Sequence, residues 1–370
     1  MDALANHPQA QARSVFEPVI TGRVQASHAY LLHGPPGSGR SEVAELVATA
    51  LLSEGSERTD NADRVKNRTH PDLTWITPEG ANGEVLVDDV RDKIIAAVPM
   101  TPFESRHRVF VIEGADRMND SSANAFLKTL EEPPHYAHLF LIADSLDSVM
   151  PTIVSRCQSV RFSPPTPAAL AEMLVRNGVE PDLANECSLL ADGNGERALT
   201  LASPHGIAIR DAGEAMAGSA LKGSASTAKA WVALLAAATD RGKTAAAEIE
   251  AASATRLEIA AKSERSKLSK EAEDRGKRAR RRAEGKAVDL ALFIAERWLR
   301  DLQRVAVGAS DLVADSNRRA QLEQHSMAAR PMQIRSAIDM VARARRAMSL
   351  NATRELALEA LAHQLDGALK

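Results

Sequence analysis

The chain has 370 residues, of which 44% are hydrophobic and 26% charged, and its formal net charge is −3. This length allows two or three domains, and the composition is typical of a soluble globular protein. The small net charge excludes a strong overall field that would attract the chain to nucleic acid or to a membrane surface.

The cysteine content and the N-terminal residues narrow the class further. The two cysteines, Cys157 and Cys187, form no Cys-x-x-Cys pair, which excludes a cysteine-based zinc site. Two cysteines in so long a chain fit a reducing cytosol. Neither a signal-peptide pattern nor a run of 18 apolar residues occurs, so we expect a cytoplasmic location and no membrane association.

Five short apolar runs alternate with helical patterns as far as Phe162. The runs are Ala29–His33, Asp72–Thr77, Arg108–Glu113, His138–Ala143 and Ser159–Phe162. Near-continuous apolar strands separated by helices predict an α/β domain with a parallel five-stranded sheet that is covered on both faces. The first run leads into a glycine-rich loop and then into a helix over Ser41–Leu52.

Two proline-containing breaks divide the rest of the chain. Residues 163–167 read Ser-Pro-Pro-Thr-Pro, which continues neither helix nor strand, and residues 203–206 read Ser-Pro-His-Gly. We therefore expect an α/β domain over residues 1–163, a small helical domain over 164–205 and an all-α domain over 206–370. The last segment is rich in alanine and shows no alternation typical of strands.

The glycine-rich loop, residues 34–41, reads Gly-Pro-Pro-Gly-Ser-Gly-Arg-Ser. Glycines at 34, 37 and 39 allow backbone N–H groups to turn around phosphate oxygens, and the helix that follows directs its positive end to the same anion. Ser41 would offer its hydroxyl to Mg²⁺, while Arg40 stands where such loops carry lysine. Because a guanidinium is broad and planar, we expect poorer placement on a γ-phosphate. The candidate nucleotide-binding residues are therefore Gly34, Gly37, Gly39, Arg40 and Ser41, and a strand-to-helix turn that binds nothing is the alternative.

Two further motifs indicate a family. Residues 121–134 read Ser-Ser-Ala-Asn-Ala-Phe-Leu-Lys-Thr-Leu-Glu-Glu-Pro-Pro, and Ser155-Arg156-Cys157 follows them. Together with the loop at 34–41, they resemble the clamp-loader ATPases of the AAA+ class, which open ring-shaped sliding clamps on DNA. The resemblance extends to Ser349–Glu359 and implies an AAA+ α/β domain, a helical lid and a helical collar through which subunits assemble.

In active relatives the third strand ends in an Asp-Glu pair, in which the aspartate orders Mg²⁺ and the glutamate polarises the attacking water. Anchoring the comparison on residues 124–128 puts Glu113 at the aspartate position and Gly114 at the glutamate position. Glycine has no side chain, so we expect no ATP hydrolysis by this chain. Rescue by Asp116 would need a shifted backbone, and an ordinary surface role for Glu113 and Asp116 is the alternative.

The resemblance also implies a role for Arg156 outside its own subunit. The matching arginine of the family reaches into a neighbour's ATP site, where a guanidinium stabilises the charge of the transferred phosphoryl group. A surface salt bridge is the alternative for Arg156, and Cys157 is expected to be a small packed residue. A nucleotide-sensing arginine of the lid would fall on Glu196 or Arg197, depending on a one-residue shift. The four-cysteine zinc module common in the family is absent from Ser53–Thr69, so no metal is expected.

The resemblance implies a clamp-loader subunit that supports the assembly and donates Arg156 to a neighbouring ATPase. Its partners would be the motor (gamma/tau) and delta subunits, with the sliding clamp and primed DNA reached through the complex. ATP bound without hydrolysis stays open. The alternatives are an ATP-hydrolysing motor subunit of the same loader and a free-standing nucleotide-loop enzyme such as a small-molecule kinase.

A DNA-binding protein is a further alternative, and it rests on Lys262–Lys286. This stretch holds eleven Lys or Arg against five acidic residues and no aromatic residue. A solvated helix or flexible insertion is the ordinary interpretation of such a charge run. Contact with DNA phosphates or with an acidic partner is the other, and base stacking is not supported.

Overall fold

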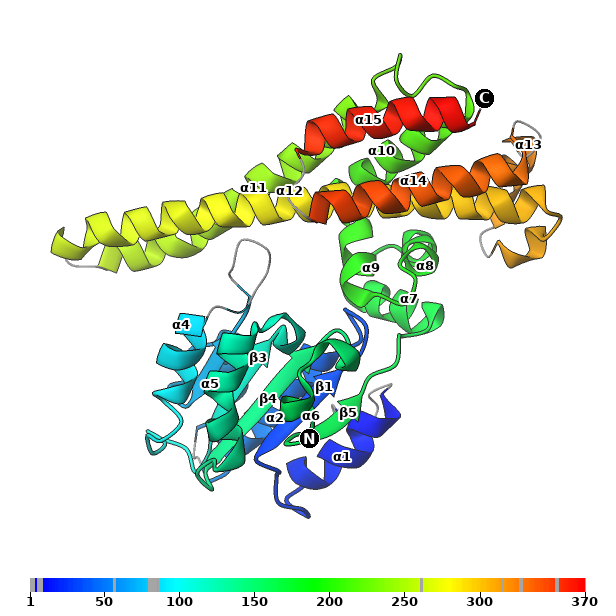
Figure 1. The fold of residues 1–370 in the computed structure, drawn as a ribbon. Coiled ribbons are helices and arrows are strands. Elements are labelled where there is room, and N and C mark those ends of the chain that lie inside the picture. The colour runs from blue at the N-terminus through cyan, green and yellow to red at the C-terminus, as the bar shows by residue number, and fades with distance from the viewer. Residues whose placement is uncertain are drawn as a thin grey trace. The chain divides into compact units, whose positions relative to one another are not determined.

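The computed structural model describes residues 4, 9–55, 58–78, 85, 87–259, 262–313, 316–325, 329–349 and 353–369 (Figure 1). Contacts divide the chain into two compact units. The α/β unit comprises Met1–Leu170 and Gly193–Glu196, and the helical unit comprises Ala171–Asp192 and Arg197–Lys370. The division into three domains at residues 163 and 205 stays a prediction. Parts of two segments discussed above lie outside the described residues. They are residues 56–57, within Ser53–Thr69, and residues 350–352, within Ser349–Glu359.

The α/β unit is built on a five-stranded sheet with the order β2-β3-β4-β1-β5. All neighbouring strands are parallel. The strands are β1 (Ala29–His33), β2 (Leu73–Ile76), β3 (Arg108–Glu113), β4 (Ala137–Ala143) and β5 (Gln158–Arg161). Each corresponds to one of the predicted apolar runs, so the predicted parallel sheet is confirmed.

Alternate side chains of each strand enter one of two cores, because successive residues of a strand point to opposite faces of the sheet. On one face, Tyr30 and Leu32 of β1 pack with α1 (Ala10–Ile20), α2 (Arg40–Ser53) and α3 (Asn61–Lys66). On the other, Leu31 packs with η1 (Val90–Ile95), α5 (Asp120–Glu131) and α6 (Pro151–Val154). Both faces of the sheet are therefore covered, as the continuous apolar runs predicted. Three short elements complete this unit: α4 (Val87–Asp89), η2 (Ala115–Arg117) and η3 (Leu146–Ser148).

The sheet topology places several loop residues at one edge. His33, the last residue of β1, pairs with Ala143 of β4 on one side and with Arg161 of β5 on the other. The glycine-rich loop therefore leaves the sheet beside the residue that follows β4, which is Asp144. In an open parallel sheet, this carboxyl edge is where ligands and functional side chains gather.

The helical unit contains no strand among its described residues, as predicted. Its elements are α7 (Pro167–Arg176), α8 (Pro181–Leu190), α9 (Gly195–Leu201), α10 (Pro204–Leu221), α11 (Ala230–Ile259), α12 (Lys262–Ala306), η4 (Ser310–Leu312), α13 (Ser316–His325), α14 (Pro331–Ser349) and α15 (Arg354–Ala368), of which α7 and α9 begin in the α/β unit. Helices α11 and α12 form a long antiparallel pair, against which α10, α14 and α15 pack (Figure 1). No helix in the described part of the chain combines the length and the apolar character needed to cross a membrane.

Buried polar contacts join helices of this unit that are distant in sequence. The carboxylate of Asp366 on α15 accepts hydrogen bonds from the backbone N–H groups of Ala225 and Ser226, each at 2.8 Å. Asp366 is 5% exposed, so these bonds replace the water that its charge would otherwise require. The last helix is thereby tied to the segment that precedes α11.

Candidate functional site

The arginine of the glycine-rich loop is engaged by the end of β4. Arg40 is the first residue of α2 and is 7% exposed. Its Nη2 donates to Asp144 Oδ1 at 2.7 Å, and its Nη1 donates to the carbonyl oxygen of Ala143. The guanidinium is therefore bound within the protein by the end of β4.

Asp144 receives a second cation. The Nη2 of Arg117 lies 2.7 Å from Asp144 Oδ2. Burial by itself raises the pKa of Asp144, but the guanidiniums of Arg40 and Arg117 outweigh it and hold that pKa below its ordinary value. The carboxylate thus stays ionised between two arginines, and the charge that Arg40 carries is compensated inside the chain.

The hydroxyl that would face Mg²⁺ is also engaged. Ser41 Oγ donates to Glu113 Oε1 at 2.9 Å. The structure thus brings together the serine of the loop and the residue at the end of β3, as their predicted shared site requires. Gly114 follows with a φ of 73°, a left-handed conformation that suits glycine, and offers no carboxylate.

Asp116, the residue considered as a substitute for the missing base, lies near Asp144. It lies in the short helix η2, and its Oδ1 is buried without a hydrogen-bond partner among the described residues. Burial raises its pKa, and the neighbouring Asp144 raises it further.

Backbone from the lid segment lies against the loop. Gly37 has a φ of 73°, and a Cβ placed on it would lie 2.3 Å from the N of Gly195 and 2.6 Å from the N of Glu196. The N–H of Gly195 donates to the carbonyl oxygen of Gly37 at 3.3 Å. The first N–H groups of α9 therefore point at the loop itself. On the other side, the Gln9 amide donates to the carbonyl oxygens of Ser38 at 3.1 Å and Ser163 at 2.7 Å.

Arg156 lies in the turn between α6 and β5, on the surface of the α/β unit. Its Nε lies 3.0 Å from Oε1 of Glu131, the last residue of α5, and its Nη1 donates to the carbonyl oxygen of Thr152 at 2.9 Å. The side chain is 33% exposed and that of Glu131 is 48% exposed. Arg156 is thus partly exposed and is held by an exposed ion pair with Glu131 and by a hydrogen bond to the carbonyl oxygen of Thr152.

The neighbouring cysteine fits a packing role. Burial raises the pKa of Cys157 to about 12, so the thiolate that a nucleophile requires is scarce near neutral pH. Cys157 packs against the core that contains α5 and α6. This is the expected behaviour of a small buried residue.

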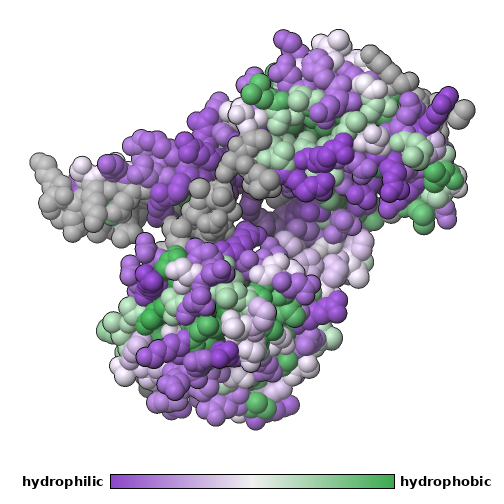
Figure 2. All heavy atoms as spheres, in the orientation of Figure 1, coloured by the Kyte–Doolittle hydropathy of each residue, from purple (hydrophilic) through white to green (hydrophobic). Residues whose placement is uncertain are grey.

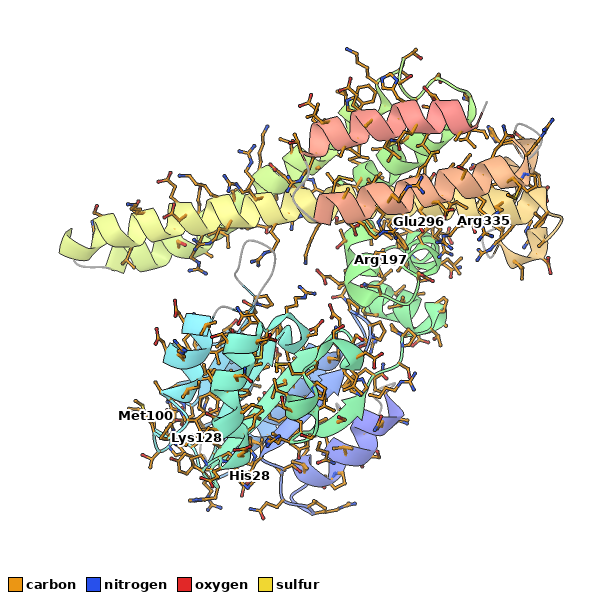
Figure 3. All side chains as sticks on the ribbon, in the orientation of Figure 1. His28, Met100, Lys128, Arg197, Glu296 and Arg335 are labelled. Carbon is orange, nitrogen blue, oxygen red and sulfur yellow. The ribbon has the colours of Figure 1, made fainter. Side chains whose placement is uncertain are left out.

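Of the two positions considered for a sensor, Arg197 is engaged within the helical unit. Its guanidinium carbon lies 3.7 Å from the centre of the Phe293 ring, and its Nη1 donates to the carbonyl oxygen of Ala191 at 3.0 Å (Figure 3). Burial lowers its pKa. The choice between Glu196 and Arg197 stays open.

Two functional partners were not singled out from the sequence. Asp144 directly follows a buried strand, and a charged residue at the carboxyl end of a parallel strand is the pattern that would have revealed it. Glu131 was visible as part of a Glu-Glu pair at a helix end, but nothing local connects it with Arg156. Among the described residues, no group of His, Cys, Asp or Glu is arranged to hold a metal ion.

Comparison with known proteins identifies relatives of the α/β unit. The family model described as DNA polymerase III, delta subunit, matches residues 10–166. The DNA polymerase III subunit delta' of Pseudomonas aeruginosa is 35% identical over 198 residues, which are 52% of this chain and 60% of that protein. The subunit delta' of Bacillus subtilis is 32% identical over 164 residues, 43% of this chain and 49% of that protein.

A relative with another subunit name matches a smaller share of this chain. The DNA polymerase III subunit tau of Bacillus subtilis is 32% identical over 151 residues, which are 39% of this chain and 26% of that protein. This chain spans 60% and 49% of the length of the two delta' relatives. The family match over residues 10–166 includes the glycine-rich loop and Arg156.

Proposed function

We propose, from the premise that residues 10–166 of this chain belong to the DNA polymerase III delta-subunit family, that the protein is a clamp-loader subunit of the delta' kind. It would support the assembly that loads a sliding clamp onto DNA and donate Arg156 to a neighbouring ATPase. The proposal rests on one observation: the side chains expected to bind nucleotide are bonded to other residues of the same chain. Arg40 is bound to Asp144, and Ser41 is bound to Glu113.

The residues present do not fit a Mg²⁺-nucleotide. The cation of such a loop reaches the β- and γ-phosphates, but Arg40 is paired with Asp144. The serine hydroxyl would face Mg²⁺, but Ser41 donates it to Glu113. Glycine at 114 leaves the attacking water without a base. The loop at 34–41 therefore serves this chain as a cross-link between β1, β4 and the start of α9, and ATP is neither held nor cleaved there. The motor-subunit alternative is not favoured for the same reason.

Arg156 would act on the neighbour in a simple way. Its guanidinium leaves Glu131 and approaches the phosphates of the adjoining subunit's ATP. There it stabilises the negative charge that grows on the equatorial oxygens during phosphoryl transfer. The described α/β unit keeps the turn between α6 and β5 rigid, because Ile153 is fully buried beside it. The chain thus contributes a positioned cation and no cleavage chemistry of its own.

The proposed partners follow from this role. Motor subunits of the gamma/tau kind would receive Arg156, and a delta subunit would complete the loader. The clamp and primed DNA would be reached through the complex, in the cytoplasm. Helices α10–α15 would supply the collar that joins the subunits. No zinc is proposed, since neither cysteine has a metal-binding neighbour among the described residues.

The test uses a loader reconstituted from this chain, motor subunits, a delta subunit and the clamp. Arg156→Ala should lower clamp-stimulated ATP hydrolysis at the neighbouring site by about 10³-fold. The total rate of hydrolysis should therefore fall by the fraction that this one site contributes. Arg161→Ala, also an exposed arginine of this region, is the matched control and should leave the rate unchanged. Size-exclusion chromatography should show intact assembly for both variants. Unchanged hydrolysis in Arg156→Ala removes the finger role, and vigorous hydrolysis by the isolated chain overturns the proposal as a whole.

A further inference from the structure

The pair formed by α11 and α12 continues beyond the helices that pack on it. The C-terminal half of α11 and the N-terminal half of α12 extend away from α10, α14 and α15 as a hairpin (Figure 1). We call residues 240–259 and 262–286 the hairpin arm; the side chains of 255–264, 267 and 271 lie outside the described ones. Figure 2 shows a hydrophilic surface along the part of this arm that is coloured.

Small residues hold the two helices of the arm together. Ala272 and Gly276 of α12 are buried, and Ala279 and Ala283 continue the same face at spacings of three and four residues. On α11, Gly242 and Ala245 are buried in turn. A seam with this heptad spacing packs two helices side by side, and alanine and glycine let them approach closely. Much of the remaining surface of this part of α12 is left to solvent.

That open face carries five cations. They are Arg275, Arg278, Arg281, Arg282 and Lys286, and all five are exposed. At 3.6 residues per turn they fall within an arc of about 140°, over a length of about 16 Å. We call them the basic face. Arg275, Arg278 and Arg281 form no side-chain ion pair with the described residues.

Two of the acidic residues nearby, Glu273 and Glu284, are paired with cations outside the basic face. Glu284 is paired with Arg280 at 2.8 Å and with Arg354 at 3.0 Å. Glu273 is paired with Lys277 at 2.6 Å. Asp274 is an exposed acid near the N-terminal end of the basic face. Three separate cations therefore compensate the two glutamates, and Arg275, Arg278 and Arg281 keep their charge for another molecule.

We propose that the basic face of the hairpin arm binds the sugar-phosphate backbone of double-stranded DNA. Four of its five cations are arginines, whose forked guanidinium matches phosphate oxygens. Residues 262–286 include no aromatic residue, so the arm cannot stack on bases and its contact is independent of sequence. The face also lacks a large apolar side chain, which a protein interface uses as its buried centre. Duplex DNA therefore fits this surface better than an acidic protein does.

The test measures binding of the full-length chain to a fluorescein-labelled DNA duplex of random sequence between 50 and 200 mM salt, by anisotropy. Replacing all five cations of the basic face by glutamine keeps good helix formers at exposed positions. If three of them meet phosphates, the slope of log K against log salt should become less steep by about 2.7. The charge-matched control replaces five exposed cations elsewhere by glutamine: Arg23, Arg91, Arg176, Lys222 and Arg343.

The outcomes separate this proposal from the function proposed above. A variant that loses duplex binding while the control keeps it, and that still assembles with motor subunits, supports the proposal. Equal binding by wild type and basic-face variant overturns it, as does an equal loss in the control. Absence of salt-sensitive duplex binding by the wild type also overturns it, and an acidic protein partner then becomes the occupant to seek. Circular dichroism confirms that the arm remains helical in each variant.

Discussion

Arg156 and Glu131 are joined across 25 residues of sequence, with 3.0 Å between Nε and Oε1. The pair connects the turn before β5 with the end of α5, and both side chains are partly exposed. Exposed ion pairs contribute about 0–1 kcal/mol, because water and salt screen them. The free chain therefore holds its candidate finger against its own surface, and a phosphate in a neighbouring subunit can replace Glu131 at small cost.

Glu131→Gln should release Arg156 from this pair. The free energy of unfolding should change by less than about 1 kcal/mol, because the pair is exposed. In the reconstituted loader, ATP hydrolysis should equal or exceed that of the wild type, since the arginine no longer has a competing carboxylate. Glu132→Gln is the matched control, being exposed and adjacent but not paired with Arg156 in the structure. A fall in hydrolysis specific to Glu131→Gln would mean that the glutamate positions the arginine for its neighbour.

Arg40→Ala should destabilise the chain without altering nucleotide affinity. The change removes the contact at 2.7 Å from Asp144, which keeps only Arg117, and should cost about 2 kcal/mol. Urea unfolding measures the loss, and titration with a fluorescent ATP analogue should show no binding by wild type or variant. Arg91→Ala, an exposed arginine, should stay near the wild-type midpoint.

A double-mutant cycle gives the prediction for Arg40 a sharper form. Arg40→Ala combined with Asp144→Asn should cost less than the sum of the two single changes, because each single change already breaks the shared contact. Strict additivity would show that the two side chains are not coupled. Tight ATP binding that disappears in Arg40→Ala would show instead that the arginine serves a phosphate.

The sheet could be predicted from sequence because each strand is marked by residues that are adjacent in the chain. Each strand is an apolar run bounded by Pro, Gly or polar residues, and every such run up to Phe162 became a strand. Capping is equally local: Asn119 directly precedes α5, and its Oδ1 accepts the N–H of Ser122 at 2.8 Å. The candidate site is different. Arg40 and Asp144 lie 104 residues apart and meet because β1 pairs with β4 in register, which depends on strand order rather than on any local pattern.

Asp72→Ala should strongly destabilise the α/β unit. Asp72 is fully buried, and its carboxylate accepts three backbone N–H groups: Phe103 at 2.5 Å, Glu104 at 2.9 Å and Ser105 at 2.9 Å. Removing the acceptor leaves these donors unpaired, which should cost about 3 kcal/mol in urea unfolding. Because Phe103 is 84% exposed at this bend, protease cleavage around it should also accelerate. Asp63→Ala, at an exposed acid on α3, should change neither measurement; equal effects in both variants would contradict a specific role for the bend.

His138 should make stability depend on pH below neutrality. Its ring is 1% exposed, and burial, with His107 and His28 adding to it, lowers its pKa to about 4. Its Nδ1 lies 3.0 Å from the carbonyl oxygen of Ser27, so the neutral ring serves as a donor there. An unfolded chain has a histidine pKa near 6.5, so between about pH 6.5 and 4 only the unfolded state takes up this proton. Its contribution is therefore fully present above pH 6.5 and is lost as the pH falls, by about 3 kcal/mol in total at 1.36 kcal/mol per pKa unit.

The measurement is the free energy of unfolding of wild type and His138→Gln at intervals from pH 7.5 to pH 4.5. Glutamine can still donate from its amide to the carbonyl oxygen of Ser27 but cannot take up a proton in this range. The difference between the two proteins should shrink as the pH falls, because only the wild type loses this stabilisation. His135→Gln, at an exposed histidine before β4, should run parallel to the wild type at every pH. A constant difference between His138→Gln and the wild type would show that His138 takes up its proton over the same pH range in the folded and unfolded chains, despite its burial.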